Sequence, residues 1–282
     1  MQTYKIKSGD TLGKVAKKFY GDPQKYTLIS KANGIRDPNK IKVGQVLDIP
    51  FNREDISDST DLMTIQSQEI PIDRTTMRLP EGQYISEPKP KNLIVLHFTA
   101  GTTARSAFNT WMADSLRIAT AYIVDTDGTI YELFDPQCWA YALGIKGQPG
   151  YPNEKRAIQI EIANVGPLKR RGDLLCWWPP DNSFQTRWCH LNEDHKYAKG
   201  SHRGCDYYAS FPDIQLLAVC NLVKYLCGRF QIPNQIPKDK INTCDLDWFT
   251  KYEGIASHQN CRRDKYDIGP AFDWDKFEEY IT

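Results

Sequence analysis

Hydrophobic and polar residues follow patterns along this chain that predict strands and helices of one mixed domain. An uninterrupted apolar run at 93–96 precedes His97, whereas residues 157–164 place apolar side chains at alternate positions, with Glu161 on the other face. The first pattern is typical of a strand buried on both faces, and the second of a strand with one polar face. Residues 214–226 instead repeat apolar side chains at helical spacing. Together they predict an α/β domain with a mixed central β-sheet flanked by helices.

The first fifty residues carry a separate, smaller pattern. A strand over 4–7 is followed by a turn, in which Asp10 is expected to cap a helix with one apolar face. A second helix is expected from Gln24 to about Ala32 and to end at Asn33, because asparagine and the glycine after it tolerate positive φ. An apolar strand closes the segment. The pattern predicts a small βααβ domain.

The chain is long enough, at 282 residues, for one large or two ordinary domains. The patterns divide it into residues 1–50, 51–88 and 89–282. The middle segment begins polar and acidic and has no sustained period, so it is interpreted as a linker whose last apolar residues contact the following domain.

Charge and composition exclude some classes of function. The 36 basic and 35 acidic residues give a net charge of +1 without a long basic run, so nucleic-acid binding is not expected. No stretch approaches about 18 uninterrupted apolar residues, so no membrane span is expected. The N-terminus has no apolar signal core, so the chain is expected to be made in the cytoplasm and to leave it by a non-classical route. Its eight cysteines are expected to be free thiols there, and their even number permits disulfides if the protein works outside the cytoplasm.

Five polar residues are candidates for chemistry. His97 closes the buried strand, Glu161 lies on the polar face of the second strand, and one late loop holds His258, Lys265 and Asp267. Two histidines and a carboxylate can hold a zinc ion with one open position, and a further glutamate can activate the water that fills it. Plainer interpretations are a core histidine, a solvent-facing carboxylate, and a surface ion pair between Lys265 and Asp267.

Four separated motifs occur in order between residues 90 and 275. They are His-x-Thr-Ala-Gly at 97–101, Asp-x-Asp-Gly-Thr-Ile-Tyr at 125–131, the Ile-Glu strand at 158–164, and the run from His258 to Trp274. With these motifs the chain resembles the type-2, zinc-dependent N-acetylmuramoyl-L-alanine amidases, which are related to peptidoglycan recognition proteins. The resemblance implies hydrolysis of the amide bond between N-acetylmuramic acid and the L-Ala of the stem peptide.

The resemblance also implies a role for each candidate residue. His97, His258 and Asp267 would bind Zn²⁺. Glu161 would be the general base, and Lys265 would stabilise the oxyanion of the tetrahedral intermediate.

Two further positions would bind substrate by the same resemblance, namely Tyr122 and Asn164. The chain also departs from the family pattern at three positions. Ala121 and Ala140 stand where many relatives have histidine, and Ile268 replaces a frequent proline. None of these changes removes a proposed zinc ligand or the base.

The N-terminal segment is similar to LysM modules, which commonly bind N-acetylglucosamine in glycans. The matching runs are Tyr-x-Ile-x-Ser-Gly-Asp-Thr-Leu at 4–12, Ala-Asn-Gly at 32–34 and Val-Gly-Gln-Val-Leu at 43–47. The resemblance implies glycan contacts at Gly9, Asp10, Thr11 and Asn33. One alternative is that these are turn and cap residues only. Another is that the module docks onto other machinery.

A long insert from about residue 166 to 211 interrupts the family pattern. It contains cysteines and histidines that suggest a second metal site, although their spacing matches no common zinc pattern: Cys189, His190, His195, His202 and Cys205. The favoured interpretation is a structured loop region that caps the cleft.

The sequence therefore predicts a peptidoglycan hydrolase with a wall-binding module. Its expected partners are glycan strands and stem peptides, together with a delivery apparatus or an immunity protein if it acts as an antibacterial effector or phage-type lysin. Two alternatives stay open: a catalytically inactive peptidoglycan-binding or sensing protein, and a cytoplasmic amidase that recycles anhydro-muropeptides.

Overall fold

The structure is a computed structural model that describes residues 2–20, 22–35, 37–49, 70–178 and 183–282. The chain forms two compact units, residues 1–69 and residues 70–282. No helix in the described ranges has both the length and the apolar character that a membrane span needs.

The N-terminal unit has the predicted βααβ order. Its elements are β1 (Gln2–Lys5), α1 (Leu12–Tyr20), a 3-10 turn (Pro23–Lys25), α2 (Tyr26–Ala32) and β2 (Val46–Ile49). The two strands pair antiparallel, and apolar side chains of α1, α2 and β2 form a core of their own.

The expected helix cap at Asp10 is wrong. The Asp10 carboxylate accepts hydrogen bonds from the Tyr4 hydroxyl and the Lys7 amide, so it closes the turn before the helix. The cap is the next residue, because Thr11 Oγ1 accepts from the Lys14 amide at 3.2 Å.

The second unit is built on the predicted mixed sheet, whose six strands lie in the order β13-β4-β7-β5-β6-β3. Their bounds are β3 Ile72–Asp73, β4 Leu93–Phe98, β5 Tyr122–Val124, β6 Ile130–Glu132, β7 Ala157–Ile162 and β13 Gly254–Ser257. Strands β13, β4, β7 and β5 run parallel, and only the β5–β6 pair is antiparallel. This parallel centre explains the continuous apolar run of β4, which is buried at every position.

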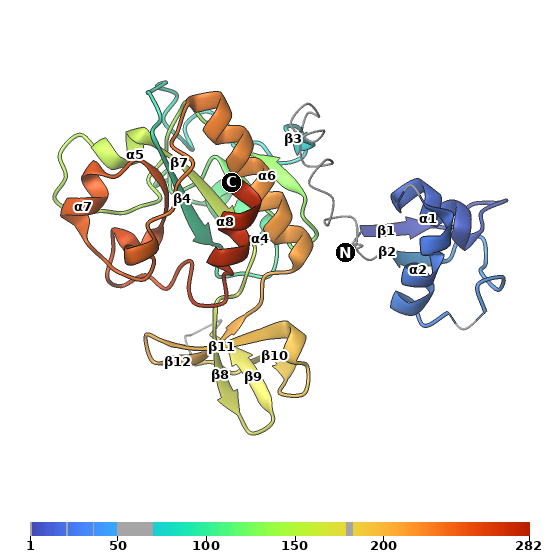
Figure 1. Ribbon diagram of the computed structural model, residues 1–282. Coiled ribbons are helices and arrows are strands. Elements are labelled where there is room, and N and C mark those ends of the chain that lie inside the picture. Colours follow the sequence, from blue (N-terminus) through green and yellow to red (C-terminus); the bar gives the residue numbers. More distant parts are fainter. Residues whose placement is uncertain (1, 21, 36, 50–69, 179–182) are drawn as a thin grey trace. The chain divides into compact units, whose positions relative to one another are not determined.

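Helices cover both faces of this sheet (Figure 1). Their bounds are α4 Ala104–Ala113, α5 Pro152–Arg156, α6 Asp213–Phe230, α7 Leu246–Lys251 and α8 Trp274–Ile281. On one face, Leu96 and Ile160 pack with α6 and α8 in the main core. On the other face, Val95 and Ala256 pack with Leu143 and with Phe249 of α7.

The insert is a second sheet rather than a loop region. Its strands, in the order β10-β9-β8-β12-β11, are β8 Pro167–Arg171, β9 Leu174–Trp177, β10 Thr186–His190, β11 Tyr197–His202 and β12 Cys205–Ala209. All its strand pairs are antiparallel, and it buries a small cluster that includes Leu168, Leu175 and Cys189.

The second unit begins before residue 89, where the sequence placed its boundary. Strand β3 pairs with β6 in the main sheet, and Met77 and Leu79 are buried in the main core. Residues 70–88, which were expected to belong to the linker, are therefore part of this unit. Residues 51–69 lie outside the described part of the chain.

Candidate active site

The parallel strands bring three candidate side chains together at their carboxyl-terminal ends. His97 on β4 is paired in register with Glu161 on β7, and His258 directly follows the end of β13 on the other side of β4. Side chains one residue apart on a strand point to opposite faces, so the alternation that puts Ile160 and Ile162 in the main core turns Glu161 to the face of His97. The carboxyl ends of parallel strands are where α/β sheets place their sites.

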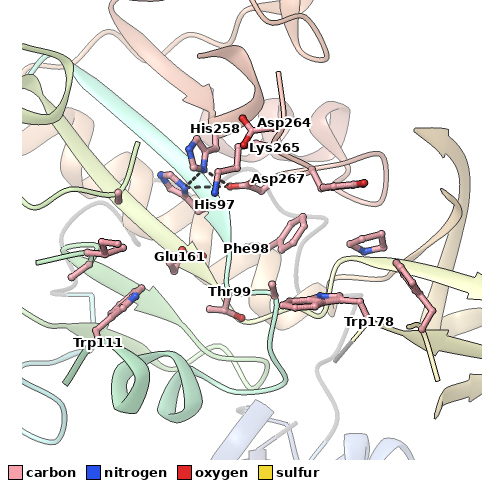
Figure 2. Close-up of a pocket in the computed structure, with 17 residues that line it drawn as sticks. His97, Phe98, Thr99, Trp111, Glu161, Trp178, His258, Asp264, Lys265 and Asp267 are labelled. Carbon is pink, nitrogen blue, oxygen red and sulfur yellow. Dashed lines mark hydrogen bonds and ion pairs between the residues drawn. The ribbon is translucent and has the colours of Figure 1, made fainter. Parts of the chain in front are cut away.

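Two histidines and one carboxylate converge at this edge (Figure 2). His97 Nδ1 lies 2.9 Å from His258 Nδ1 and 3.2 Å from Asp267 Oδ2, and His258 Nδ1 lies 2.9 Å from the same oxygen. All three residues are buried. Within the described residues they form the only group of three or more histidine, cysteine or acidic side chains arranged to hold a metal ion.

The hydrogen bonds of His258 show that these residues fit a bound cation. Its Nε2 lies 2.9 Å from the carbonyl oxygen of Leu143, which can only accept, so Nε2 carries the proton. In the neutral ring, Nδ1 then presents a lone pair toward His97 and Asp267. Lone pairs and a carboxylate that face one another at these distances repel unless a cation or extra protons lie between them. A set of two imidazoles and one carboxylate oxygen is a common donor set for zinc.

The electrostatic environment favours the forms that bind metals. Burial and the neighbouring His258 lower the pKa of His97 to about 4, so its imidazole is neutral at physiological pH. Burial alone would raise the pKa of the Asp267 carboxyl, but His258 and His97 together hold it well below its usual range. Neutral imidazole and ionised carboxylate are the ligating forms of these side chains.

Glu161 and Lys265 share a cavity of about 560 Å³ with the three residues. Burial raises the pKa of Glu161 well above its ordinary value, the charge of Asp267 raises it further, and Lys265 opposes the shift. The Oε2 atom of Glu161 is buried and has no hydrogen-bond partner among the described residues. A carboxylate in such surroundings is a stronger base than an exposed one, because desolvation disfavours its charged form.

Aromatic side chains line the rest of this cavity. Figure 2 shows Trp111 and Trp178 on opposite sides of it, with Phe98 and Thr99 of the β4 end between them. The insert supplies one wall through Pro167, Trp178 and Phe184. The insert was expected to cap the cleft, but Trp111 and Phe184 were not among the predicted site residues. No local pattern indicates that these two side chains meet at one cavity.

The insert also contacts the loop that carries Asp267. A methyl group added at Gly200 of β11 would come within 2.8 Å of Pro270 Cβ, so the backbone of β11 lies close to the Pro270 ring. A Cβ added at Gly269 would likewise lie 3.2 Å from ring carbons of Tyr208 on β12. The insert is therefore a brace for residues 267–270 as well as a wall.

The prediction that Tyr122 lines the cleft is wrong. Tyr122 is fully buried in the main core, and its hydroxyl donates to Glu132 Oε2 at 3.1 Å. The register explains this placement, because Tyr122 pairs with Ile160 and so points to the face opposite Glu161. Its neighbour Ile123 is the residue that pairs in register with Glu161.

Asn164, which was predicted to bind substrate, has its side-chain polar atoms engaged within the protein. Its side-chain nitrogen donates to the carbonyl oxygens of Ala209 and Ser210, and its side-chain oxygen accepts from the Gly166 amide. Asn164 is buried. It ties the two ends of the insert together, and its polar atoms are used in doing so.

The suggested second metal site does not form. Its five residues are spread over β10, β11, β12 and the turn between the first two, and they are not part of any metal-binding group in the described ranges. All eight cysteines are free thiols.

The glycan-contact positions of the N-terminal unit differ in their availability. Asn33 joins α2 to β2, since Nδ2 donates to the Ile29 and Asp48 carbonyls while Oδ1 accepts from the Asp48 amide. Its side chain is therefore already used, like that of Asp10. Gly9 and Thr11 are exposed and stay as predicted contacts.

Two family models match the chain. Residues 87–270 match the model described as N-acetylmuramoyl-L-alanine amidase, and residues 4–50 match the LysM domain. Both matches agree with the resemblances seen in the sequence.

Similar curated proteins share only short segments with this chain. An esterase of Mycobacterium tuberculosis is 52% identical over 52 residues, which is 18% of this chain and 11% of that protein. The potassium binding protein Kbp of Escherichia coli is 47% identical over 51 residues, which is 17% of this chain and 34% of that protein. The chain thus spans about a third or less of these relatives.

Solved structures of similar proteins include several amidases. The amidase AmiD of Escherichia coli, in complex with anhydro-N-acetylmuramic acid-L-Ala-D-gamma-Glu-L-Lys, has 20% identity and a TM-score of 0.42, covering 73% of this chain and 61% of that one. PlyL has 14% identity and a TM-score of 0.41, covering 76% and 97%. The amidase LysC of Clostridium intestinale has 13% identity and a TM-score of 0.38, covering 76% and 98%.

Proposed function

We propose that this chain, which belongs to the N-acetylmuramoyl-L-alanine amidase family, is a zinc-dependent hydrolase of the amide bond between N-acetylmuramic acid and L-Ala in peptidoglycan. The observation that carries the proposal is the convergence of His97 Nδ1, His258 Nδ1 and Asp267 Oδ2 in the cavity that Glu161 lines. Amidase family membership supplies the substrate class.

The three converging residues would hold the zinc ion. When bound, zinc would supply a Lewis acid that polarises the amide carbonyl and lowers the pKa of water. Leu143 keeps the proton of His258 on Nε2, so Nδ1 is available to the metal in the required form.

Glu161 performs the proton transfers in this proposal. It accepts a proton from the attacking water as the carbonyl carbon is attacked, and it returns that proton to the L-Ala nitrogen as the C–N bond breaks. The raised pKa of Glu161 suits both steps, because a base that is too weak would hold the proton poorly for the second transfer. Lys265, in the same cavity, stabilises the negative charge that develops on the carbonyl oxygen.

The LysM unit binds the substrate polymer and keeps the second unit near it. A tethered binding module raises the effective concentration of cleavable bonds around the enzyme. This favours insoluble peptidoglycan over soluble fragments as the natural substrate. Action at the cell wall also requires a delivery route, and we propose an injection apparatus or cell lysis for it. In a producing cell, an immunity protein would be the expected partner.

Metal reconstitution tests the proposal directly. Protein stripped with a chelator is titrated with zinc, and bound metal and hydrolysis of N-acetylmuramoyl-L-Ala-D-isoglutamine are measured together. We expect activity to rise in proportion to bound zinc up to one ion per chain, and His97→Ala to abolish both. Full activity in the stripped protein would contradict the zinc assignment, and stoichiometric zinc without hydrolysis would favour a binding protein.

A further inference from the structure

A buried carboxylate outside the cavity holds the loop next to His258. Glu154 of α5 is 4% exposed, and its oxygens accept from three consecutive amides: Ala142 at 3.3 Å, Leu143 at 3.0 Å and Gly144 at 3.1 Å. Its fourth donor is Gln159 Nε2 at 2.8 Å. These four donors offset the cost of burying the carboxylate and fix its position against the 142–144 loop.

One peptide group connects this carboxylate to the metal-binding cluster. The amide of Gly144 and the carbonyl of Leu143 belong to the same peptide bond. The amide donates to Glu154 Oε1, and the carbonyl accepts from His258 Nε2 at 2.9 Å. The result is a continuous chain from carboxylate through peptide to imidazole, which ends at the Nδ1 lone pair of His258.

The loop needs an acceptor at this position to point its carbonyl inward. Leu143 is fully buried, and Gly144 has a left-handed φ of 60°. The Leu143 amide is buried and depends on an acceptor, so without Glu154 this turn would rotate its amides toward water. Rotation would carry the Leu143 carbonyl away from His258, because the carbonyl and the Gly144 amide move as one planar group.

We propose that Glu154 is a positioning residue of the metal centre, which acts on His258 through the Leu143–Gly144 peptide. It fixes which nitrogen of His258 carries the proton, and its negative charge polarises the peptide so that the carbonyl accepts more strongly. A stronger acceptor at Nε2 makes Nδ1 a better ligand. The inference rests on the proposed zinc binding by His97, His258 and Asp267.

The test compares zinc affinities of folded variants by competition with a chromophoric chelator. Glu154→Gln keeps the shape but turns an NH₂ group toward amide donors, and we expect zinc to bind about 10- to 100-fold more weakly. Glu132→Gln is the matched control. Glu132 is also a buried carboxylate, but it contacts Tyr122, Arg74 and Arg78 on the opposite side of the sheet.

The control separates positioning from general destabilisation. We expect Glu132→Gln to lower stability while the zinc affinity of the folded protein stays within about threefold of wild type, which corresponds to less than 1 kcal/mol. Equal zinc affinity in wild type and Glu154→Gln would overturn this inference and leave the proposed function intact. A wild-type protein that binds no zinc would overturn both.

If Glu154→Gln does not fold, a measurement on the wild-type protein tests the proposal instead. In protein labelled with ¹⁵N, we expect the Gly144 amide to exchange with solvent as slowly as amides of the central strands, and His258 to carry its proton on Nε2 with and without zinc. Rapid exchange of the Gly144 amide, or a proton on Nδ1 of His258 in the zinc-bound protein, would overturn the proposal.

Discussion

Removing the hydroxyl of Tyr122 separates a structural role from a catalytic one. In Tyr122→Phe the ring stays in the main core, and the single lost interaction is the 3.1 Å hydrogen bond to Glu132. Hydrogen bonds to charged groups contribute about 1.5–3 kcal/mol. Glu132 keeps Arg74 at 3.2 Å and Arg78 at 3.0 Å, so it is not left unpaired, and the loss falls at the lower end of that range.

The expected result is a less stable enzyme with unchanged kinetics. A loss of about 1.5–2 kcal/mol corresponds to a fall in Tm of about 3–8 °C for a domain of this size. Tryptophan fluorescence reports on the second unit alone, because the first of the seven tryptophans is Trp111. We expect kcat/KM to stay within about twofold, or roughly 0.4 kcal/mol of transition-state stabilisation.

The control is Tyr131→Phe on the neighbouring strand β6, where the side chain is partly exposed. It should change stability by less than about 0.5 kcal/mol. A Tyr122→Phe protein of wild-type stability whose kcat/KM falls tenfold would contradict this structural role, since it would place the hydroxyl at the substrate.

Three further predictions concern parts outside the metal centre. Asn164→Ala should lower stability by about 2–3 kcal/mol, because the Ala209 and Ser210 carbonyls lose their donor and the Gly166 amide loses its acceptor; unchanged stability in urea unfolding with a raised KM would return Asn164 to the substrate. Gly200→Ala should lower kcat/KM by about 10- to 100-fold, because the added methyl displaces Pro270 and with it the Asp267 loop; wild-type kinetics would show that the insert does not brace that loop. Removal of residues 1–69 should slow digestion of insoluble peptidoglycan without changing hydrolysis of a soluble muramoyl dipeptide, and equal loss on both substrates would contradict a tethering role.

The fold was largely predictable from the sequence because its signals are local. The apolar run of β4 and the alternation of β7 each identify a strand, and alternation alone turns Glu161 away from Ile160. The insert was not predictable as a sheet. Its strand β8 ends in exposed residues and β11 alternates weakly between partly and fully exposed positions, so neither shows a clear buried face.

Of the site, only the residues that lie in sequence motifs could be predicted. The structure brings His97, His258 and Asp267 together, but the face on which Tyr122 lies depends on its pairing with Ile160, which no local pattern reveals. Glu154 was missed for the same reason. A glutamate between Asn153 and Lys155 in a short polar helix is expected on the surface, and only the structure shows that the 142–144 loop folds over it.

Digestion of purified sacculi tests directly whether the chain is an amidase that uses Glu161 as its base. Wild-type protein and Glu161→Gln, which keeps the size of the side chain but cannot accept the proton, are incubated with insoluble peptidoglycan, and soluble products are identified by mass spectrometry. The account predicts free stem peptides that begin with L-Ala from the wild type and at least about 100-fold less from the variant. Release of sugar-bearing fragments instead, or equal release by both proteins, would contradict it.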